Sequence, residues 1–433
     1  MTDAAGRPLP DLDTAVALAE ARIRAVREGL SPRHARLPLR YWRQQAHFTT
    51  PAEASLARKA VEGGTTPMAR ILDRFEVGPA MLADRLGVDV ARVERLLARP
   101  RRSPMVMLDA EDALALTDAA VAQARSDAAD VLCDADWDGD GPRTLRFYRP
   151  PGLELGSTAR ELYSLLWALA ERSADGTVPL DGIVFPKVEH PEEVDLIHGM
   201  LTETERALGL PIGGIRVAYL VESGWAAAQL PAIAQRAADR LCALVFGLAD
   251  YSADVGLRAI ANEHLLADWA RAMIIDVAGA AGVPAVDGMT LDYPVADPSL
   301  DAAANRTRFL ERMQLVNRDA IRARDLGMRG KWVGHPAQLF AVLLAYDADG
   351  GDEDLDAEAA KLEAYDAAVR AGQGATMIGG VMSDRATDRH ARAVLRQATA
   401  MGRFAPQRAL ALGVIGPDEV ADADAAWRGA TEA

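Results

Sequence analysis

The sequence predicts an α/β protein built on a (β/α)8 barrel (TIM barrel), with helical extensions before and after it. Three observations lead to this prediction. Short apolar runs alternate with longer amphipathic runs through the middle of the chain, as in repeated βαβ units. The short runs number eight, as a closed barrel requires, and most of them end in a polar or charged residue. The 433 residues are enough for one barrel of roughly 250 residues with extensions.

The predicted strands are short apolar runs bounded by polar or turn-forming residues. In chain order they are Tyr41–Phe48, Met105–Asp109, Thr144–Arg149, Gly182–Lys187, Ile215–Glu222, Ala243–Gly247, Val286–Leu291 and Lys331–Gly334. Buried parallel strands are expected to be apolar throughout, yet these runs close in sequences such as LRFYR, IVFPK, YLVES and KWVGHP. Strand carboxyl ends meet at one face of a barrel, so we expect these polar side chains to line one mouth.

Three parts are predicted along the chain. Residues 1–103 form an N-terminal extension that holds the first strand and a helical insertion over 64–102. Residues 104–344 form the barrel. Residues 345–433 form a helical, lid-like region, entered through the acidic loop 345–360.

Composition excludes several classes of protein. The net charge of −15 makes the chain a poor binder of polyanions, so nucleic acid is an unlikely partner. Cys133 and Cys242 fit no metal-binding spacing and are expected to be reduced thiols. No run reaches the roughly 18 apolar residues of a membrane span, and residues 1–10 have no apolar leader. We therefore expect a cytoplasmic protein without a membrane partner.

Two carboxylates end consecutive predicted strands. Glu222 follows one apolar run and Asp250 follows the next, so both can reach one cation at the barrel mouth. Mg²⁺ is commonly held by one or two carboxylates, with water and substrate oxygens completing its shell. The alternative is that both residues are helix N-caps or support other ligands, and spacing alone does not separate the two interpretations.

An acidic cluster, Asp109, Glu111 and Asp112, follows the second predicted strand. These carboxylates can orient metal-bound water. They also suit the first turn of a helix, where the helix dipole favours acids. The two interpretations are compatible.

Basic residues close the next two strands. A guanidinium at a barrel mouth suits capture of a carboxylate or stabilisation of a developing enolate. The alternating pattern places Arg146 and Tyr148 on one side of their strand, and Arg149, before Pro150, is predicted to lie in the loop. Lys187 is either an anion-binding group or, as we favour, an ion-pair partner of the acidic cluster.

Three further segments have structural interpretations that we favour over functional ones. His335 is predicted to be a hydrogen-bonded turn residue rather than a catalyst. Residues 134–140 mimic the start of an EF-hand loop, but Leu145 stands where a bidentate glutamate is required, so a solvated acidic loop is predicted. Residues 82–97, with a turn at Gly87, mimic a helix-turn-helix, although a helical decoration of the barrel is favoured over DNA binding.

Seven blocks of the chain resemble, in order, the citrate lyase β-subunit and malyl-CoA lyase group (HpcH/HpaI aldolase superfamily). The blocks are LDAEDALALTDAAVAQAR (108–125), RFY (146–148), GIVFPKVEHPEEV (182–194), YLVES (219–223), FGLADYSADVG (246–256), GKWVGHPAQL (330–339) and GGVMSDRATDRHARAVL (379–395). The resemblance runs in order from about residue 104 to residue 400. Single blocks are weakly specific, whereas seven in order are strongly so.

The resemblance implies a (β/α)8 barrel with a C-terminal lid, usually in a trimer or hexamer. It implies a Mg²⁺ site on Glu222 and Asp250, with Mn²⁺ as an alternative ion. It implies a substrate-binding arginine at Arg146 and a catalytic aspartate at Asp384, delivered by the lid of a neighbouring subunit. Glu111 and Asp112 would hold metal-bound water, and Lys187 would join the substrate site.

The implied activity is Mg²⁺-dependent cleavage or formation of a β-hydroxyacyl-CoA thioester, with glyoxylate or pyruvate as the oxo acid. One departure concerns CoA: the family opens with RSLLFVPG, and the nearest equivalent here is WRQQAHFTTPAEA (42–54). Three alternatives stay open. They are a class II pyruvate aldolase acting on free 4-hydroxy-2-oxo acids, a DNA-binding regulator using 82–97, and a non-catalytic metabolite-binding barrel.

Overall fold

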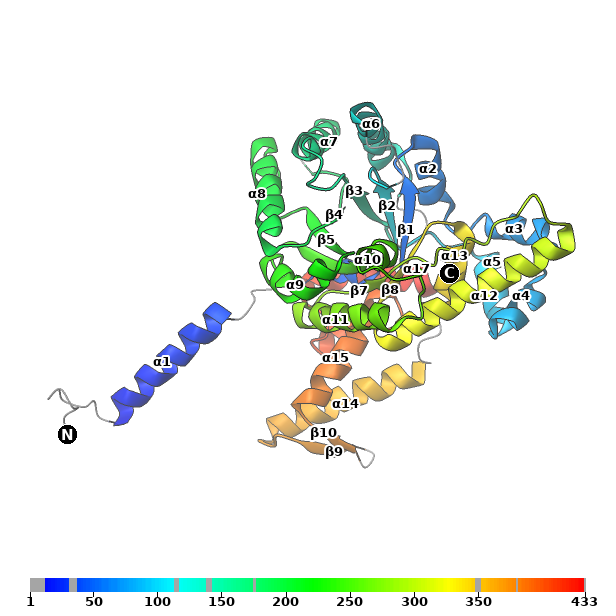
Figure 1. Cartoon of the computed structure of the whole chain (residues 1–433). Helices are drawn as coiled ribbons and strands as arrows, with labels where there is room; N and C mark the ends of the chain where they lie inside the picture. The colour runs from blue at the N-terminus through cyan, green and yellow to red at the C-terminus, as the bar shows by residue number, and fades with distance from the viewer. Residues whose placement is uncertain are drawn as a thin grey trace.

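The computed structural model describes residues 12–30, 37–112, 117–137, 142–173, 177–346, 352–378 and 381–431. Eight parallel strands form a closed barrel in sequence order (Figure 1). They are β1 (Ala46–Pro51), β2 (Met105–Asp109), β3 (Leu145–Arg149), β4 (Gly182–Phe185), β5 (Arg216–Val221), β6 (Leu241–Phe246), β7 (Ala285–Asp287) and β8 (Gly330–Val333). The predicted fold class is confirmed.

Every predicted strand has a counterpart, but the first was misplaced. The start of the predicted strand Tyr41–Phe48 is a short 3-10 helix, η1 (Leu39–Trp42), and β1 begins only at Ala46. Pro38 begins this turn, and its carbonyl accepts a hydrogen bond from the Tyr41 amide. The Tyr41 hydroxyl donates to the Asp181 carbonyl, just before β4. Residues 39–42 therefore lie against the amino-terminal end of the barrel instead of in its wall.

An outer layer of helices covers the barrel. These helices are α6 (Asp118–Asp134), α7 (Thr158–Arg172), α8 (Pro191–Leu208), α9 (Gly224–Arg236), α10 (Leu248–Asp254), α11 (Leu265–Ala281), α12 (Ala302–Leu326) and α13 (Pro336–Tyr346). One continuous apolar core joins the strands to this layer. The barrel interior is filled by side chains, as is usual for this fold.

A helical insertion separates β1 from β2, as predicted. It contains α2 (Ala54–Gly63), α3 (Met68–Arg74), α4 (Pro79–Leu86) and α5 (Val90–Ala98). Gly87 ends α4 in the left-handed region, with φ of 67°, which an L side chain rarely adopts. In the same segment Arg92 donates to the Leu344 carbonyl of α13. Helices α4 and α12 also pack together (Figure 1), so the segment 82–97 forms a decoration of the barrel.

The C-terminal region contains more than helices. Its elements are α14 (Asp352–Arg370), the hairpin β9 (Thr376–Ile378) and β10 (Val381–Ser383), α15 (Arg385–Ala400), α16 (Pro406–Ala411), η2 (Pro417–Glu419) and α17 (Val420–Thr431). The predicted loop 345–360 is therefore shorter than expected: α13 ends at Tyr346, residues 347–351 lie outside the described part, and α14 begins at Asp352.

This region packs against the amino-terminal end of the barrel. It has its own apolar core, to which Leu39 of η1 contributes, and both α15 and α17 contact η1. Arg396 of α15 donates to the Leu37 carbonyl and pairs with Glu419. In Figure 1, α14 and the β9–β10 hairpin project below the barrel, so the lid-like arm starts from the end opposite the strands' carboxyl ends.

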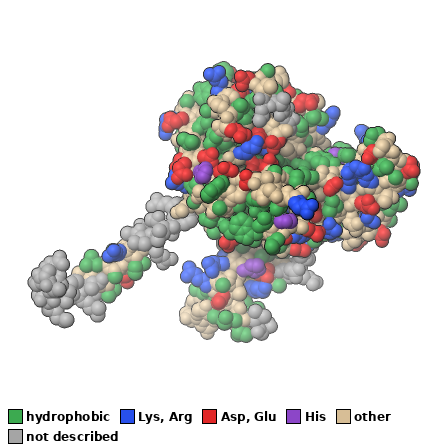
Figure 2. All heavy atoms as spheres, in the orientation of Figure 1, with side chains coloured by type: hydrophobic (Ala, Val, Ile, Leu, Met, Phe, Trp, Pro, Cys, Tyr) green, Lys and Arg blue, Asp and Glu red, His purple; other side chains and the backbone are tan. Residues whose placement is uncertain are grey.

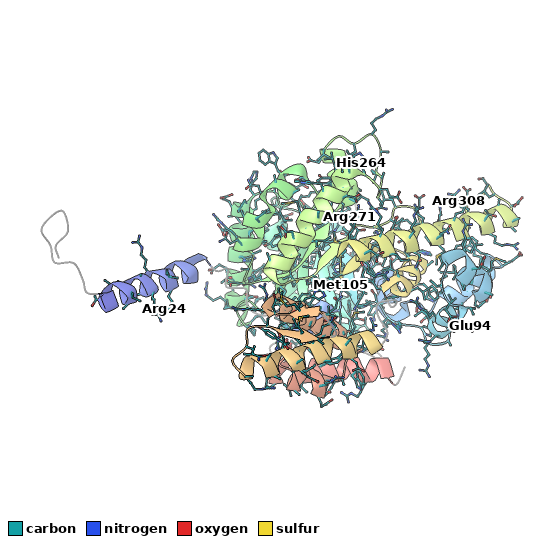
Figure 3. The ribbon with its side chains drawn as sticks, turned by 90° about the horizontal axis from the view of Figure 1, so that it is seen from below. Arg24, Glu94, Met105, His264, Arg271 and Arg308 are labelled. Atoms are coloured by element: carbon teal, nitrogen blue, oxygen red, sulfur yellow. The ribbon has the colours of Figure 1, made fainter. Side chains whose placement is uncertain are left out.

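Another projection is the helix α1 (Leu12–Leu30), which carries Arg24 and extends away from the barrel (Figure 3). On the face shown in Figure 2, acidic and basic side chains are interspersed. Cys133 and Cys242 are both free, as expected. Among the described helices, none combines the length and apolar character needed to cross a membrane.

Candidate active site

The carboxyl ends of β2 to β5 bring charged side chains into the barrel mouth. Residues that pair in register on parallel strands point to the same side of the sheet. Asp109 pairs with Arg149, and Phe147, two residues earlier, packs over Gly182 inside the barrel. Following the register to β5 places Leu220, and therefore Glu222 two residues later, on this inner side. The predicted gathering of charged groups at one mouth is confirmed for these residues.

Arg149 is the centre of the cluster. Its Nε and Nη2 atoms donate to the two carboxylate oxygens of Asp109 at 2.7 and 2.6 Å. Its Nη1 atom lies 3.2 Å from Glu111 Oε2 and 3.0 Å from Asp112 Oδ2. Burial alone would lower the pKa of Arg149, but Asp109 and the other two carboxylates hold it above its usual value. Such a bidentate, charge-assisted pair is among the stronger hydrogen-bonded arrangements.

Lys187 contacts both Glu222 and the acidic residues around Arg149. Its Nζ atom lies 2.6 Å from Glu111 Oε1 and 3.3 Å from Glu154 Oε1. Its backbone adopts φ of 54°, rare for a lysine, and its amide donates to Glu222 Oε1 at 2.6 Å. Burial opposes the charge of Lys187, yet the hydrogen bond to Glu111 raises its pKa. The favoured interpretation, an ion-pair partner for the acidic cluster, is confirmed.

Glu222 is a buried carboxylate without an ion pair to a cationic side chain among the described residues. Burial raises its pKa to about 7; the Lys187 amide opposes this shift and the nearby Asp250 carboxylate adds to it. Gly247 makes room for this side chain, because a Cβ there would lie 2.6 Å from Glu222 Cβ and 2.9 Å from its Oε2. Glycine at 247 therefore keeps the carboxylate at the mouth.

Asp250 lies in the first turn of α10, directly after β6. It is exposed, and desolvation together with the Asp112 carboxylate raises its pKa. The cluster as a whole contains six acids and two bases. These are Asp109, Glu111, Asp112, Glu154, Glu222 and Asp250 with Arg149 and Lys187.

This donor set fits a hard divalent cation. Glu222 Oε2 and the Asp250 carboxylate are oxygen donors whose pKa values are raised first by burial and then by nearby carboxylates, so a cation between them would relieve the cost of ionising both groups. Within the described ranges, no group of three or more His, Cys, Asp and Glu side chains is arranged as a metal site. A cation would thus have two protein carboxylates, and water or substrate oxygens would complete its shell.

Arg146 does not join the cluster, contrary to the expectation for a substrate-binding residue at the mouth. It shares its side of β3 with Tyr148, as predicted, but this is the outer side. Burial raises the pKa of the Tyr148 hydroxyl, and the charges of Glu161 on α7 and Arg125 on α6, two outer helices, also act on that pKa. Arg146 lies near the start of β3, its amide donates to Asp181, and its guanidinium lies 5.5 Å from the Trp137 ring centre. Arg149, predicted to lie in the loop, is instead the last residue of β3.

Asp384 lies apart from the cluster in this chain. It is the N-cap of α15, and its carboxylate accepts hydrogen bonds from the Ala386 and Thr387 amides at 2.9 and 3.1 Å. These hydrogen bonds lower its pKa. The mouth and the base of the arm are at opposite ends of the barrel, so the structure does not bring Asp384 of this chain to Glu222 and Asp250.

Two of the structural interpretations can be assessed from the described residues. His335 Nδ1 accepts from the Ala337 amide at the start of α13, and burial lowers its pKa, in accord with a turn residue. Trp137, in the EF-hand-like segment, is buried and donates to the Val131 carbonyl, which the predicted solvated loop did not anticipate. Residues 138–140 of this segment lie outside the described part.

Sequence reasoning missed two members of the cluster, Arg149 as a central residue and Glu154. A signal for Arg149 was available: it occupies the strand's last position and alternates with Leu145 and Phe147, which face the interior. Glu154 lies in the loop after β3, and nothing in its local pattern distinguishes it from other loop acids.

Comparisons with known proteins bear on the whole barrel. A family model described as "Domain of unknown function (DUF6986)" matches residues 39–425. The chain is 30% identical over 311 residues to an L-malyl-CoA/beta-methylmalyl-CoA lyase of Cereibacter sphaeroides, covering 68% of this chain and 87% of that protein. The corresponding lyase of Rhodobacter capsulatus matches with the same identity and coverage.

A solved structure described as a citrate lyase from Burkholderia xenovorans has a similar fold. It superimposes with a TM-score of 0.56 at 21% identity, covering 88% of this chain and 99% of that one. At this level of identity the likeness bears on the fold alone.

Proposed function

Because the chain belongs to the DUF6986 family and to the citrate lyase β-subunit-like superfamily of carbon–carbon lyases, we propose that it is a Mg²⁺-dependent CoA-thioester lyase. It cleaves or forms a β-hydroxyacyl-CoA, with glyoxylate or pyruvate as the oxo acid and an acyl-CoA as the second product. One observation carries the proposal: a buried Glu222 directly after β5 and an exposed Asp250 in the first turn of α10, which follows the neighbouring strand β6, lie at a mouth with surplus acid.

Glu222 and Asp250 would hold the Mg²⁺, with Mn²⁺ as the alternative ion. Bound there, the cation would supply Lewis-acid polarisation of the oxo group. Glu111 and Asp112 would orient water near this position, since both carboxylates are fixed by Arg149. Lys187, expected among the substrate-binding residues, would act through its amide on Glu222 and through its ammonium on Glu111.

Arg149 takes the role that the resemblance gave to Arg146. It is the guanidinium at the inner, carboxyl end of β3, whereas Arg146 faces the helices near the strand's start. Its positive charge stabilises oxygen charge that develops at the mouth during bond cleavage. Its three carboxylate partners fix its plane before substrate arrives, and this removes a reorganisation cost from the reaction step.

A neighbouring copy of the chain completes the site. Asp384 would reach the mouth from the arm of another subunit and exchange the proton as general acid or base. A homo-oligomer, a trimer or hexamer, is therefore part of the proposal. Support comes from the arm itself, which extends from the barrel and has Asp384 directly after β10, a strand whose Met382 side chain is exposed.

The first experiment measures release of glyoxylate or pyruvate from malyl-, citramalyl- and methylmalyl-CoA, beside free 4-hydroxy-2-oxo acids, with Mg²⁺ and with EDTA. We expect EDTA-sensitive release from at least one thioester. Release from the free acids alone would replace the proposal by a class II pyruvate aldolase. Release from neither set would contradict lyase activity on these substrates.

The metal site is tested by Asp250→Ala. We expect turnover to fall at least roughly 100-fold, since even residues that support metal ligands commonly contribute 10–100-fold. Asp276→Ala is the matched control, because Asp276 is an exposed aspartate on α11, outside the cluster. Wild-type turnover in Asp250→Ala would refute the assignment.

The shared site is tested by mixing two inactive variants. Glu222→Gln lacks a metal ligand, and Asp384→Asn lacks the group from the arm. If sites form between subunits, unfolding and refolding the two variants together restores part of the activity, because some sites receive both intact residues. Activity that stays absent from the mixture, while each variant is folded and oligomeric, would place Asp384 outside the reaction.

A further inference from the structure

Glycines at the barrel mouth each make room for one neighbouring group. At Gly247 that group is Glu222. At Gly334, just beyond β8, a Cβ would lie only 2.2 Å from the Tyr293 hydroxyl oxygen. Val286, on the inner side of β7, pairs with Gly330 of β8. Because alternate residues of a strand point to the same side, Trp332 and position 334 also face the interior. The Tyr293 hydroxyl therefore occupies an inner position at the mouth, in the space of a missing side chain.

A second hydroxyl lies beside it. Phe48 of β1 pairs with Val333 of β8, so Thr49 is level with Gly334 on the adjacent strand. Thr49 also pairs with Met107, which shares the inner side with Asp109, and thus points inward. Neighbouring strands lie about 5 Å apart, so the Thr49 side chain starts from the strand position beside Gly334, the residue that the Tyr293 hydroxyl approaches.

A third residue with a neutral donor, Trp332, lies near the charged cluster. It lies two residues before Gly334 on the same side, and its ring centre is 5.4 Å from the guanidinium carbon of Arg149. Its Nε1–H is a third neutral donor on the β8–β1 side of the mouth. The charged groups come from β2 to β6, so the mouth has a charged part and a neutral donor part.

The neutral donors lack strong acceptors within the chain. Thr49 Oγ1 and Trp332 Nε1 are buried and have no hydrogen-bond partner among the residues described. The Tyr293 hydroxyl donates to Met289 Sδ at 2.9 Å, and a thioether is a weak acceptor. Burial raises the pKa of Tyr293, so the phenol keeps its proton and remains a donor. Unpaired buried donors cost free energy, which an acceptor oxygen on a ligand would recover.

We propose that Thr49, Tyr293 and Trp332 form a subsite that binds the thioester carbonyl oxygen of the substrate. The inference rests on the proposed function and names the part of the substrate that this side of the mouth recognises. A carboxylate suits charged donors, and both bases of the cluster belong to the charged part of the mouth. An uncharged carbonyl suits three neutral donors.

The subsite would act during bond cleavage as well as in binding. The electron pair of the breaking carbon–carbon bond passes to the carbon next to the thioester carbonyl, the α-carbon, and is shared with the thioester oxygen as an enolate. The hydroxyl on the other carbon loses its proton and becomes the oxo group, and a proton then adds to the α-carbon to give the acyl-CoA. Donors on the thioester oxygen stabilise the enolate more than the neutral carbonyl, and this favours the reaction.

Binding is tested first, because it does not depend on turnover. Calorimetry compares acetyl-CoA with S-ethyl-CoA, in which a methylene replaces the carbonyl. We expect wild-type protein to prefer acetyl-CoA, and Thr49→Val and Tyr293→Phe each to reduce this preference roughly three- to tenfold. Thr307→Val and Tyr163→Phe are the controls, since both residues are exposed on outer helices. Equal binding of the two ligands by wild-type protein would overturn the subsite.

Kinetics and stability separate this role from a structural one. In Thr49→Val and Tyr293→Phe we expect kcat to fall more than KM rises. Thr49→Ser, which keeps a hydroxyl, should have a kcat close to that of wild type. Because the Thr49 hydroxyl has no partner, Thr49→Val should leave Tm unchanged or raised. Unchanged kcat in both variants, or a lowered Tm with intact carbonyl preference, would overturn the subsite while lyase activity stands. Absence of both turnover and CoA-ligand binding in wild-type protein would overturn the proposed function and the subsite together.

Discussion

Two charged clusters lie on opposite sides of the barrel wall, and their charge balance differs. The mouth cluster has six acids and two bases, and the pKa of its buried Glu222 is raised. The outer cluster, between β7, β8, α11 and α12, has three acids and three bases. They are Asp268, Asp287, Asp319, Arg271, Lys331 and Arg322.

In the outer cluster, pairing outweighs burial. Asp287 is 1% exposed, yet Lys331 at 2.8 Å and Arg271 at 2.7 Å hold its pKa below its usual range, although burial alone would raise it. Arg271 reaches this cluster from α11 (Figure 3). Glu222, similarly buried, lacks such partners. The same degree of burial thus accompanies a balanced cluster that stabilises the fold and an unbalanced one suited to bind a cation.

The largest expected effect comes from unbalancing the outer cluster. Asp287→Asn leaves Lys331 and Arg271 buried without their shared carboxylate, and we expect a loss of about 3–5 kcal/mol in unfolding free energy. Urea denaturation measures it. The double variant Asp287→Asn/Lys331→Met, which removes both members of one pair, should be more stable than the single variant. A single variant within 1 kcal/mol of wild type would contradict the pairing argument.

Next in size is a change at the mouth that keeps the charge. Arg149→Lys retains a cation but loses the bidentate contact with Asp109. We expect kcat/KM to fall about 10²–10³-fold, the range seen when one group that stabilises a developing oxyanion is removed. Arg146→Lys, on the outer side of the same strand, is the control and should lose far less. Equal losses in the two variants would leave the role of Arg149 unsupported.

A smaller effect should appear as a pH dependence of stability. The pKa of Glu222 rises from 4.5 to about 7 on folding, so the folded state holds the proton more tightly. Without divalent ions, this group's contribution to stability falls as pH rises from about 4.5 to 7 and then levels off, by at most roughly 3 kcal/mol.

Thermal denaturation of wild type and Glu222→Gln at several pH values measures this contribution. In EDTA the two proteins should melt alike near pH 4.5, and the wild type should melt lower near pH 8. Saturating Mg²⁺ should reverse the order at pH 8, because only wild type binds the ion fully. A constant difference between the proteins across this range would show that Glu222 titrates normally.

The barrel was predictable from sequence because its pattern is local and repeated. Each strand combines a short apolar run with a polar end, and the register places those ends together. Glu222 and Asp250 were predicted to lie at one mouth for this reason, and the structure has Glu222 directly after β5 and Asp250 in the first turn of the helix after β6. The first strand was misplaced because Leu39 and Tyr41 pack against the barrel's end, a tertiary contact that no local pattern reveals.

Other features depended on long-range geometry. Choosing between Arg146 and Arg149 required knowing which side of β3 faces the interior, and each side of that strand holds one of the two arginines. Thr49 and Tyr293 are 244 positions apart in the sequence, and only the barrel register and the approach of the Tyr293 hydroxyl to Gly334 place both of them on one side of the mouth. The outer cluster likewise joins α11 to β7 and β8, and sequence gave no reason to pair these residues.

The smallest expected effect concerns charges outside both clusters. Glu203 and Arg206 form an ion pair on α8 with side chains 73% and 61% exposed. Exposed pairs gain little because water screens them, so Glu203→Gln should change unfolding free energy by no more than about 0.5 kcal/mol. Glu205, two residues further along α8, is fully buried and pairs with Arg240 through two hydrogen bonds of 2.8 and 2.6 Å.

Glu205→Gln is therefore the matched comparison on the same helix, and it should cost several times more. Urea denaturation of both variants, at low and high salt, measures the difference; only the exposed pair should respond to salt. Similar costs for the two variants would mean that burial does not set the value of an ion pair in this fold. The contrast between the outer and mouth clusters would then need a cause other than the balance of buried charge.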